Sequence, residues 1–254
     1  MSDPTPKREP LNAPDSLKAF DTTHWSVVLL ASGGITADSR QALETLCRTY
    51  WSPLYAYLRR TGITPEESKD LVQGFLARLL ERDDLATVGP EKGRFRTYLL
   101  AGLRNFLVSE RRRSSAQKRG GHAQILSLDS EEAERICGND LASERTPEAA
   151  FDRRWAETIL ERALAALRAE HEAKGKVQAY DQLKPFLSGD DEGGYARVAA
   201  ELGMSTGTIA VAVHRLRARL RDLIRHEVAR TVGAEGDVDA EMRTLMTVWT
   251  SGNR

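Results

Sequence analysis

Apolar residues recur at intervals of three and four positions along most of this chain, which is the spacing of one face of an α-helix. The helices that this spacing predicts cover residues 39–60, 65–80, 95–113, 147–167, 180–187, 196–202, 206–220 and 242–249. Pro53 lies inside the first of them and predicts a kink or a restart there. No stretch alternates apolar and polar residues as a half-buried β-strand would. We therefore expect an all-α fold.

Two of these helices carry a clear start signal. Thr64 precedes Pro65, and Thr146 precedes Pro147, and each pair is followed by glutamate. A threonine at the N-cap accepts a hydrogen bond from a backbone N–H of the first turn, and proline is favoured at the first helical position. The glutamates are favoured by the positive end of the helix dipole. We expect helices to begin at residues 65 and 147.

Residues 195–225 contain the most specific local pattern. A first helix ends at Gly203, a residue suited to the conformation that terminates helices, and Ser205 can cap a second helix. Two helices joined by so short a turn are typical of a helix-turn-helix, whose second helix can lie in the major groove of DNA. Arginines and small polar residues line its exposed face and suit phosphates and base edges. The alternative is an ordinary helical hairpin with a solvated basic face.

Composition limits the classes of protein that fit. The 254 residues include 37 acidic and 37 basic side chains, so any affinity for nucleic acid must come from local basic patches. Cys47 and Cys137 lie far apart, which argues against a disulfide framework and a zinc site. There is no signal-peptide pattern and no apolar run long enough to cross a bilayer. We expect a soluble cytoplasmic protein without a membrane partner.

Catalytic motifs are missing from the sequence. It has no Gly-rich phosphate loop and no HExxH, and its five histidines are scattered. We therefore expect no enzymatic activity, no catalytic residue, no cofactor and no metal.

Shifts in composition divide the chain into segments. The start is polar and proline-rich, and after residue 114 the composition turns from basic to acidic, which predicts an extended solvated tether. The expected segments are a disordered leader (1–20), a helical domain (21–119), an acidic linker (120–146), a second helical domain (147–232) and a C-terminal extension (233–254). The side chains expected to dock the short amphipathic helix of the extension on the second domain are Met242, Leu245, Met246 and Trp249.

Three motifs then occur in a specific order. Residues 70–73 read DLVQ within a helix, residues 95–113 run from FRTYL through Asn105 to three arginines, and residues 195–220 hold the helix-turn-helix. On these motifs the chain resembles an extracytoplasmic-function (ECF) sigma factor of the sigma-70 family. It is most similar to the large planctomycete-type members with extended N- and C-termini. The resemblance implies that the first helical domain is region 2-like and the second is region 4-like.

The resemblance also implies a function, partners and sites. The chain would be an RNA polymerase sigma factor that directs promoter recognition, DNA melting and transcription initiation, with the β′ and β subunits of core RNA polymerase and promoter DNA as partners. The residues implied in core polymerase binding are Glu66, Glu67, Asp70, Leu71, Gln73 and Phe75. Those implied in −10 DNA binding are Arg104, Asn105, Arg111, Arg112, Arg113, Lys118 and Arg119. Those implied in −35 DNA binding are Tyr195, Arg197, Ser205, Thr206, Thr208, His214, Arg215 and Arg217.

The aromatic and basic residues of 95–119 each have a second interpretation. The spacing of Phe95, Tyr98 and Phe106 suits a buried stripe, and we expect burial rather than base stacking. The arginine run could be a solvated helix end favoured by the dipole. Because it adjoins a further basic loop in a neutral chain, we expect it to follow DNA phosphates and to make binding salt-dependent.

One departure from the family pattern concerns the polymerase-binding helix. The family carries carboxylates where this chain has Lys69 and Gly74. We hypothesise that core binding is weak or conditional, and that a phosphate on Ser68 could restore negative charge. The regulator stays open among an anti-sigma factor, a Ser/Thr kinase and the C-terminal extension.

Two other functions fit parts of the sequence. A free-standing helix-turn-helix regulator with a helical sensor or dimerisation domain would explain residues 195–225, but it would call for a ligand pocket in the first domain. An adaptor that binds only proteins would leave the basic patches in both domains unexplained.

Overall fold

The computed structural model describes residues 37–81, 95–116, 146–189, 192–232 and 235–251, and these residues form helices and turns with no strand among them. The all-α prediction is confirmed. The helices are α2 (Ala37–Arg60), α3 (Pro65–Glu81), α4 (Phe95–Ala116), α6 (Pro147–Ala173), α7 (Val177–Leu183), the 3₁₀ helix η5 (Lys184–Leu187), α8 (Glu192–Leu202), α9 (Thr206–Ala229) and α10 (Glu235–Ser251). The expected leader (1–20) and nearly all of the expected linker lie outside the described residues.

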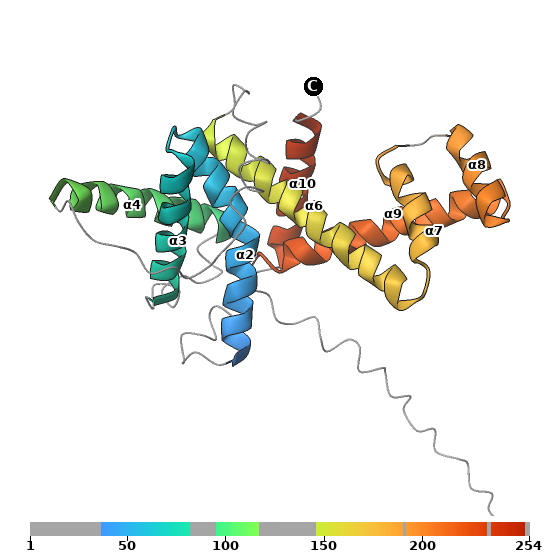
Figure 1. Cartoon of the computed structure of the whole chain (residues 1–254), viewed down its shortest axis with the longest axis horizontal. Helices are drawn as coiled ribbons and strands as arrows, with labels where there is room; N and C mark the ends of the chain where they lie inside the picture. Colours follow the sequence, from blue (N-terminus) through green and yellow to red (C-terminus); the bar gives the residue numbers. More distant parts are fainter. Residues whose placement is uncertain (1–36, 82–94, 117–145, 190–191, 233–234, 252–254) are drawn as a thin grey trace, which may run out of the picture.

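Helices α2, α3 and α4 gather at one end of the molecule (Figure 1). Helix α2 continues through Pro53 without a break, so the predicted restart is wrong. Thr64 caps α3 by accepting a hydrogen bond from the Glu67 N–H at 3.3 Å, as predicted. On α4 the phenylalanines Phe95 and Phe106 are buried, which confirms the stripe at these two positions, and Tyr98 is half-buried against the core.

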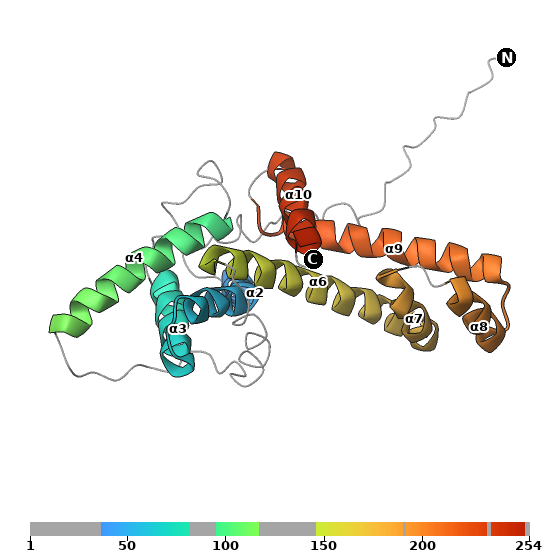
Figure 2. The same ribbon diagram turned by 90° about the horizontal axis from the view of Figure 1, so that it is seen from above.

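Helix α6 is the longest described helix and connects the two ends of the molecule (Figure 2). Thr146 caps it by accepting from the Ala149 N–H at 3.2 Å, as predicted. Near its start Arg154 donates to Ser52 Oγ of α2 at 2.7 Å, and farther along Arg162 donates to Glu227 of α9 at 2.8 Å. The first half of α6 therefore packs on α2 and the second half on α9.

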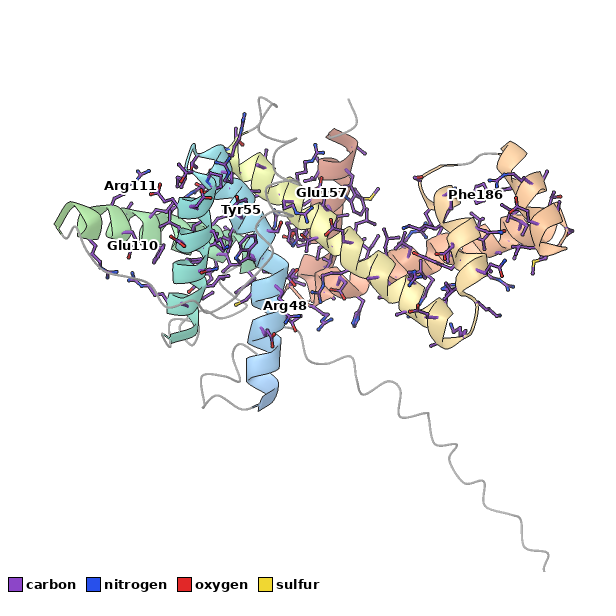
Figure 3. The ribbon with its side chains drawn as sticks, viewed as in Figure 1. Arg48, Tyr55, Glu110, Arg111, Glu157 and Phe186 are labelled. Carbon is purple, nitrogen blue, oxygen red and sulfur yellow. The ribbon has the colours of Figure 1, made fainter. Side chains whose placement is uncertain are left out.

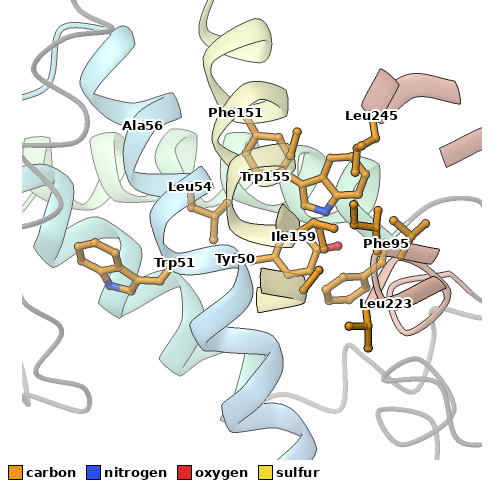
Figure 4. Close-up of a cluster of buried hydrophobic side chains, with 14 of the residues drawn as sticks. Tyr50, Trp51, Leu54, Ala56, Phe95, Phe151, Trp155, Ile159, Leu223 and Leu245 are labelled. Atoms are coloured by element: carbon orange, nitrogen blue, oxygen red, sulfur yellow. The ribbon is translucent and has the colours of Figure 1, made fainter. Parts of the chain in front are cut away.

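A single hydrophobic core lies at the junction where α2, α4, α6 and α10 meet. Figure 4 shows Tyr50 of α2, Phe95 of α4, Trp155 of α6 and Leu245 of α10 in one cluster, and all four side chains are almost fully buried. The rings of Tyr50 and Phe95 meet edge to face with centroids 5.3 Å apart. The apolar contacts therefore continue from α2 to α10.

The other end of the molecule holds the helix-turn-helix. Helix α8 ends in a turn where Gly203 has φ of +65°, and Ser205 caps α9 by accepting from the Thr208 N–H at 3.1 Å. Both features were predicted. The structure differs at the start of α8, which begins at Glu192 and includes Gly193 and Gly194, whereas the helix predicted from the sequence begins at residue 196. The motif is anchored by an edge-to-face contact between Phe186 and Tyr195 at 4.8 Å.

Helix α10 packs against both α6 and α9 near the middle of the molecule (Figure 1, Figure 2). Val238 and Leu245 are buried, and Met242 and Trp249 pack on the core at its edge. Met246 is 52% exposed, so its expected docking contact is wrong, because it lies on the outer face of the helix.

Candidate nucleic-acid and polymerase interfaces

The first candidate interface is one edge of α3. Glu66, Glu67 and Asp70 are exposed along it, and Leu71 and Gln73 are half-buried beside them. Phe75, which the resemblance placed in the same interface, is buried and packs its ring 5.8 Å from that of Phe106. The structure therefore brings the acidic residues together on the surface and turns the phenylalanine towards α4.

Two residues of α3 correct the hypothesis of regulated binding. Ser68 is fully buried, with its Oγ 3.5 Å from the carbonyl oxygen of Ile63, so a kinase cannot reach it in the folded chain. The expectation of a phosphorylation site there is corrected on that ground. Gly74 lies so close to α4 that a β-carbon would stand 3.3 Å from Cζ of Phe106. A side chain at this position would therefore require the Phe106 ring to shift, whereas Lys69 is half-buried at the surface.

The second candidate interface is the outer face of α4. Asn105 and the three arginines Arg111, Arg112 and Arg113 are exposed, and Figure 3 shows Arg111 near the end of α4 that points away from the helix-turn-helix. Arg104 is held by Glu148 of α6 and donates to the Tyr57 hydroxyl at 3.1 Å. Both hydrogen bonds raise the pKa of Arg104, and the bond to Tyr57 contributes the most. Lys118 and Arg119 lie outside the described residues.

A cavity of about 470 Å³ opens between α3 and α4 beside Asn105. Its lining residues are Phe75, Arg78, Leu79, Tyr98, Ala101, Gly102, Asn105, Phe106 and Ser109. Gly102 lets the Phe75 ring approach, since a β-carbon there would stand 3.3 Å from that ring. The cavity thus offers aromatic walls with an amide at its border, which sequence patterns alone did not reveal.

The third candidate interface is the start of α9. Thr206, Thr208, His214 and Arg215 are exposed, while the Ser205 side chain is engaged as the cap. Before the turn, Arg197 is exposed and pairs with Glu201 at 3.3 Å, and Tyr195 is half-buried against Phe186. The residues of the expected −35 site therefore surround one end of the motif.

Arg217 is half-buried and is turned towards η5. Its guanidinium donates to the Phe186 carbonyl oxygen at 2.6 and 3.1 Å and to the Gly189 carbonyl oxygen at 3.0 Å. It thereby holds the end of η5 against α9. Arg217 therefore stabilises the packing of η5 on α9.

Sequence patterns also missed a buried group of charges at the junction. Arg96 of α4 binds Asp152 of α6, approaches Glu241 of α10 with 2.9 Å between Nε and Oε2, and lies over the Trp155 ring. Burial would lower the pKa of Arg96, but the two carboxylates outweigh it and raise the pKa. Burial also raises the pKa of the neighbouring Tyr50. The group ties α4, α6 and α10 together.

Neither a metal site nor a membrane-spanning helix occurs in the described part of the chain. Within the described ranges, no three His, Cys, Asp or Glu residues are arranged to hold a metal ion. The same part of the chain has no helix with the length and apolar character needed to cross a membrane.

Comparison with known proteins identifies the family. No curated protein and no solved structure matches this chain. The family model described as "ECF sigma factor" matches residues 41–226, which include α3, α4, α6 and the helix-turn-helix. This match favours an RNA polymerase sigma factor, a DNA-binding partner of core polymerase, over a free-standing regulator. The chain belongs to the ECF sigma factor family.

Proposed function

We propose that this sigma factor recognises promoters with two helical surfaces. Residues 147–232 act as a region 4-like unit, in which the first turns of α9 enter the major groove of the −35 element. Residues 21–119 act as a region 2-like unit, in which α4 contacts the −10 element and helps to melt it. The supporting observation is that α4 and the helix-turn-helix lie at opposite ends of the molecule (Figure 1) and that both carry exposed basic side chains.

Melting requires a site that holds an unpaired base. Removing a base from the stack costs a few kcal/mol, and aromatic stacking can offset roughly 1–3 kcal/mol of that cost. The cavity beside Asn105 has aromatic walls and an amide that can bond a base edge. The exposed arginines Arg111, Arg112 and Arg113 continue along α4 and would hold the neighbouring phosphates.

Core polymerase binding is proposed for the exposed acidic edge of α3. Glu66, Glu67 and Asp70 would meet basic residues of the β′ subunit, with Leu71 beneath them. Charges at such a rim chiefly set the encounter rate and the register. Lys69 places a positive charge on the same helix, so binding by the unmodified chain is weak.

The polymerase contact is tested by co-purification with bacterial core RNA polymerase. Asp70→Arg should abolish binding, whereas the matched reversal Glu172→Arg, at an exposed site on α6, should not. Lys69→Glu should tighten binding. Equal affinities of the wild type and Lys69→Glu would overturn the proposal of weak binding, and insensitivity to Asp70→Arg would overturn the α3 interface.

The DNA contacts are tested with the reconstituted holoenzyme on promoter fragments. Asn105→Ala should reduce melting at the −10 element, read by permanganate reactivity of unpaired thymines. Arg215→Ala should reduce protection of the −35 element in footprinting. Arg168→Ala, an exposed arginine on α6, is the control. If Asn105→Ala and Arg215→Ala behave like this control, neither surface contacts the promoter as proposed.

A further inference from the structure

The outward face of α9 carries a narrow apolar strip among its polar residues. Ile209, Val213 and Leu216 are buried and define the inner face. Because positions three and four apart share a face of a helix, Gly207 and Val211 lie together on the opposite side. The exposed His214 and Arg215 follow them. If α9 docks on a partner through this face, Val211 lies at the centre of the contact, and His214 and Arg215 offer hydrogen-bonding groups one turn farther along.

Val211 is 51% exposed, and packing of the chain does not account for it. Among the described residues the exposed large apolar side chains are Val108, Met204, Val211 and Met246. Two of these, Met204 and Val211, border the first turn of α9. A β-branched residue on a solvated helix face lowers helix propensity slightly and leaves apolar surface in water. The position therefore suits an apolar contact with a partner.

Gly207 is a second, independent feature of the strip. A β-carbon at this position would meet only Ser205 Oγ, at 3.8 Å, so alanine fits the fold without a clash. Glycine within a helix is destabilising relative to alanine, and it lets a backbone approach a ligand closely. Since internal packing does not require glycine here, close approach of α9 to its partner is the physical reason that remains.

We infer that Val211 reads a thymine of the −35 element by packing on its 5-methyl group, while Gly207 lets α9 come close enough to do so. In the major groove the thymine methyl is the one apolar group that a base edge presents. His214 and Arg215, one turn on, supply donors for the adjacent bases or phosphates. The inference rests on the proposed function, because it assumes that α9 enters the −35 groove.

The test begins with a duplex selected from a random-sequence library by the full-length protein in its holoenzyme. Each thymine of the −35 block is then replaced singly by deoxyuridine, which removes only the 5-methyl group. At one thymine the wild type should lose about fourfold in affinity, which is the burial of one methyl group converted through RT. Val211→Ala should lose affinity for the unmodified duplex and show a reduced response to that replacement. Met246→Ala, which removes an exposed apolar side chain on α10, should respond like the wild type.

The variant Gly207→Ala provides a second test of the inference. It should keep or raise the melting temperature of the free protein, because alanine favours helix, and it should weaken binding of the selected duplex several-fold. A selected duplex in which no deoxyuridine matters, or in which the response is the same in Val211→Ala, would overturn the Val211 assignment and leave the proposed function standing. Failure of the holoenzyme to select any duplex would overturn both.

Discussion

Replacing Arg96 tests whether the charges at the junction hold the molecule together. Arg96→Met keeps a long apolar stem over Trp155 but removes the cation that binds Asp152 and Glu241. Glu241 has only 1% of its side chain exposed, so its carboxylate would remain buried without this counter-charge. Breaking a buried ion pair on one side typically costs about 3–5 kcal/mol. We expect a loss of that size in the free energy of unfolding.

The control is an ion pair on the surface of the same bundle. Arg48 and Glu44 of α2 lie 2.6 Å apart with side chains 61% and 47% exposed. Removal of such a pair through Arg48→Met should cost under about 1 kcal/mol. Urea unfolding of the full-length protein, followed by circular dichroism, measures both variants. The second variant Arg96→Met/Glu241→Leu should recover part of the loss, because it also removes the buried carboxylate.

Two results would refute this reasoning. If Arg96→Met costs no more than Arg48→Met, the buried charges do not hold α10 and α4 in place. If Glu241→Leu brings no recovery in the Arg96→Met background, the cost does not come from the stranded carboxylate.

Three further predictions follow from single contacts. Burial raises the pKa of Cys47 to about 12, so iodoacetamide at pH 8 should label it only after unfolding, as read by peptide mass spectrometry. The hydrogen bond from Arg219 lowers the pKa of Glu170, so its stabilisation is present above the unfolded pKa and disappears as the pH falls through the folded value. The difference in unfolding free energy between wild type and Glu170→Gln, under about 1 kcal/mol, should therefore shrink as the pH falls below the unfolded pKa of about 4.3 and vanish below the lower folded pKa. Arg217→Ala should destabilise the fold by about 1–3 kcal/mol, because it removes charged hydrogen bonds to the Phe186 and Gly189 carbonyl oxygens, whereas Arg215→Ala should leave stability unchanged.

Local sequence signals predicted the helices because each signal acts within one turn. The caps at Thr64, Thr146 and Ser205 and the left-handed Gly203 are confirmed, since cap hydrogen bonds and glycine conformation depend on nearest neighbours. The closeness of Arg96 and Glu241 could not be predicted this way. The two residues lie far apart in the chain, and helical periodicity does not say which helices pack together.

Two structural findings at candidate site residues had signals in the sequence that charge and motif arguments outweighed. Ser68 precedes Val72 by four positions, and both are buried, so helical spacing already put Ser68 on the inner face of α3. Arg217 follows the buried Val213 by the same interval, which places it at the border of the inner face. The −10 and −35 contacts themselves stay predictions, because packing within the chain does not determine its contacts with RNA polymerase or DNA.

Transcription of genomic DNA from the source bacterium tests the central claim most directly. Core RNA polymerase is supplied with wild-type protein, with Arg215→Ala or with no added protein, and the RNA 5′ ends are mapped. The account predicts new 5′ ends that share a two-block upstream motif and that weaken with Arg215→Ala. The same 5′ ends with and without the protein, under conditions where the two co-purify, would contradict it.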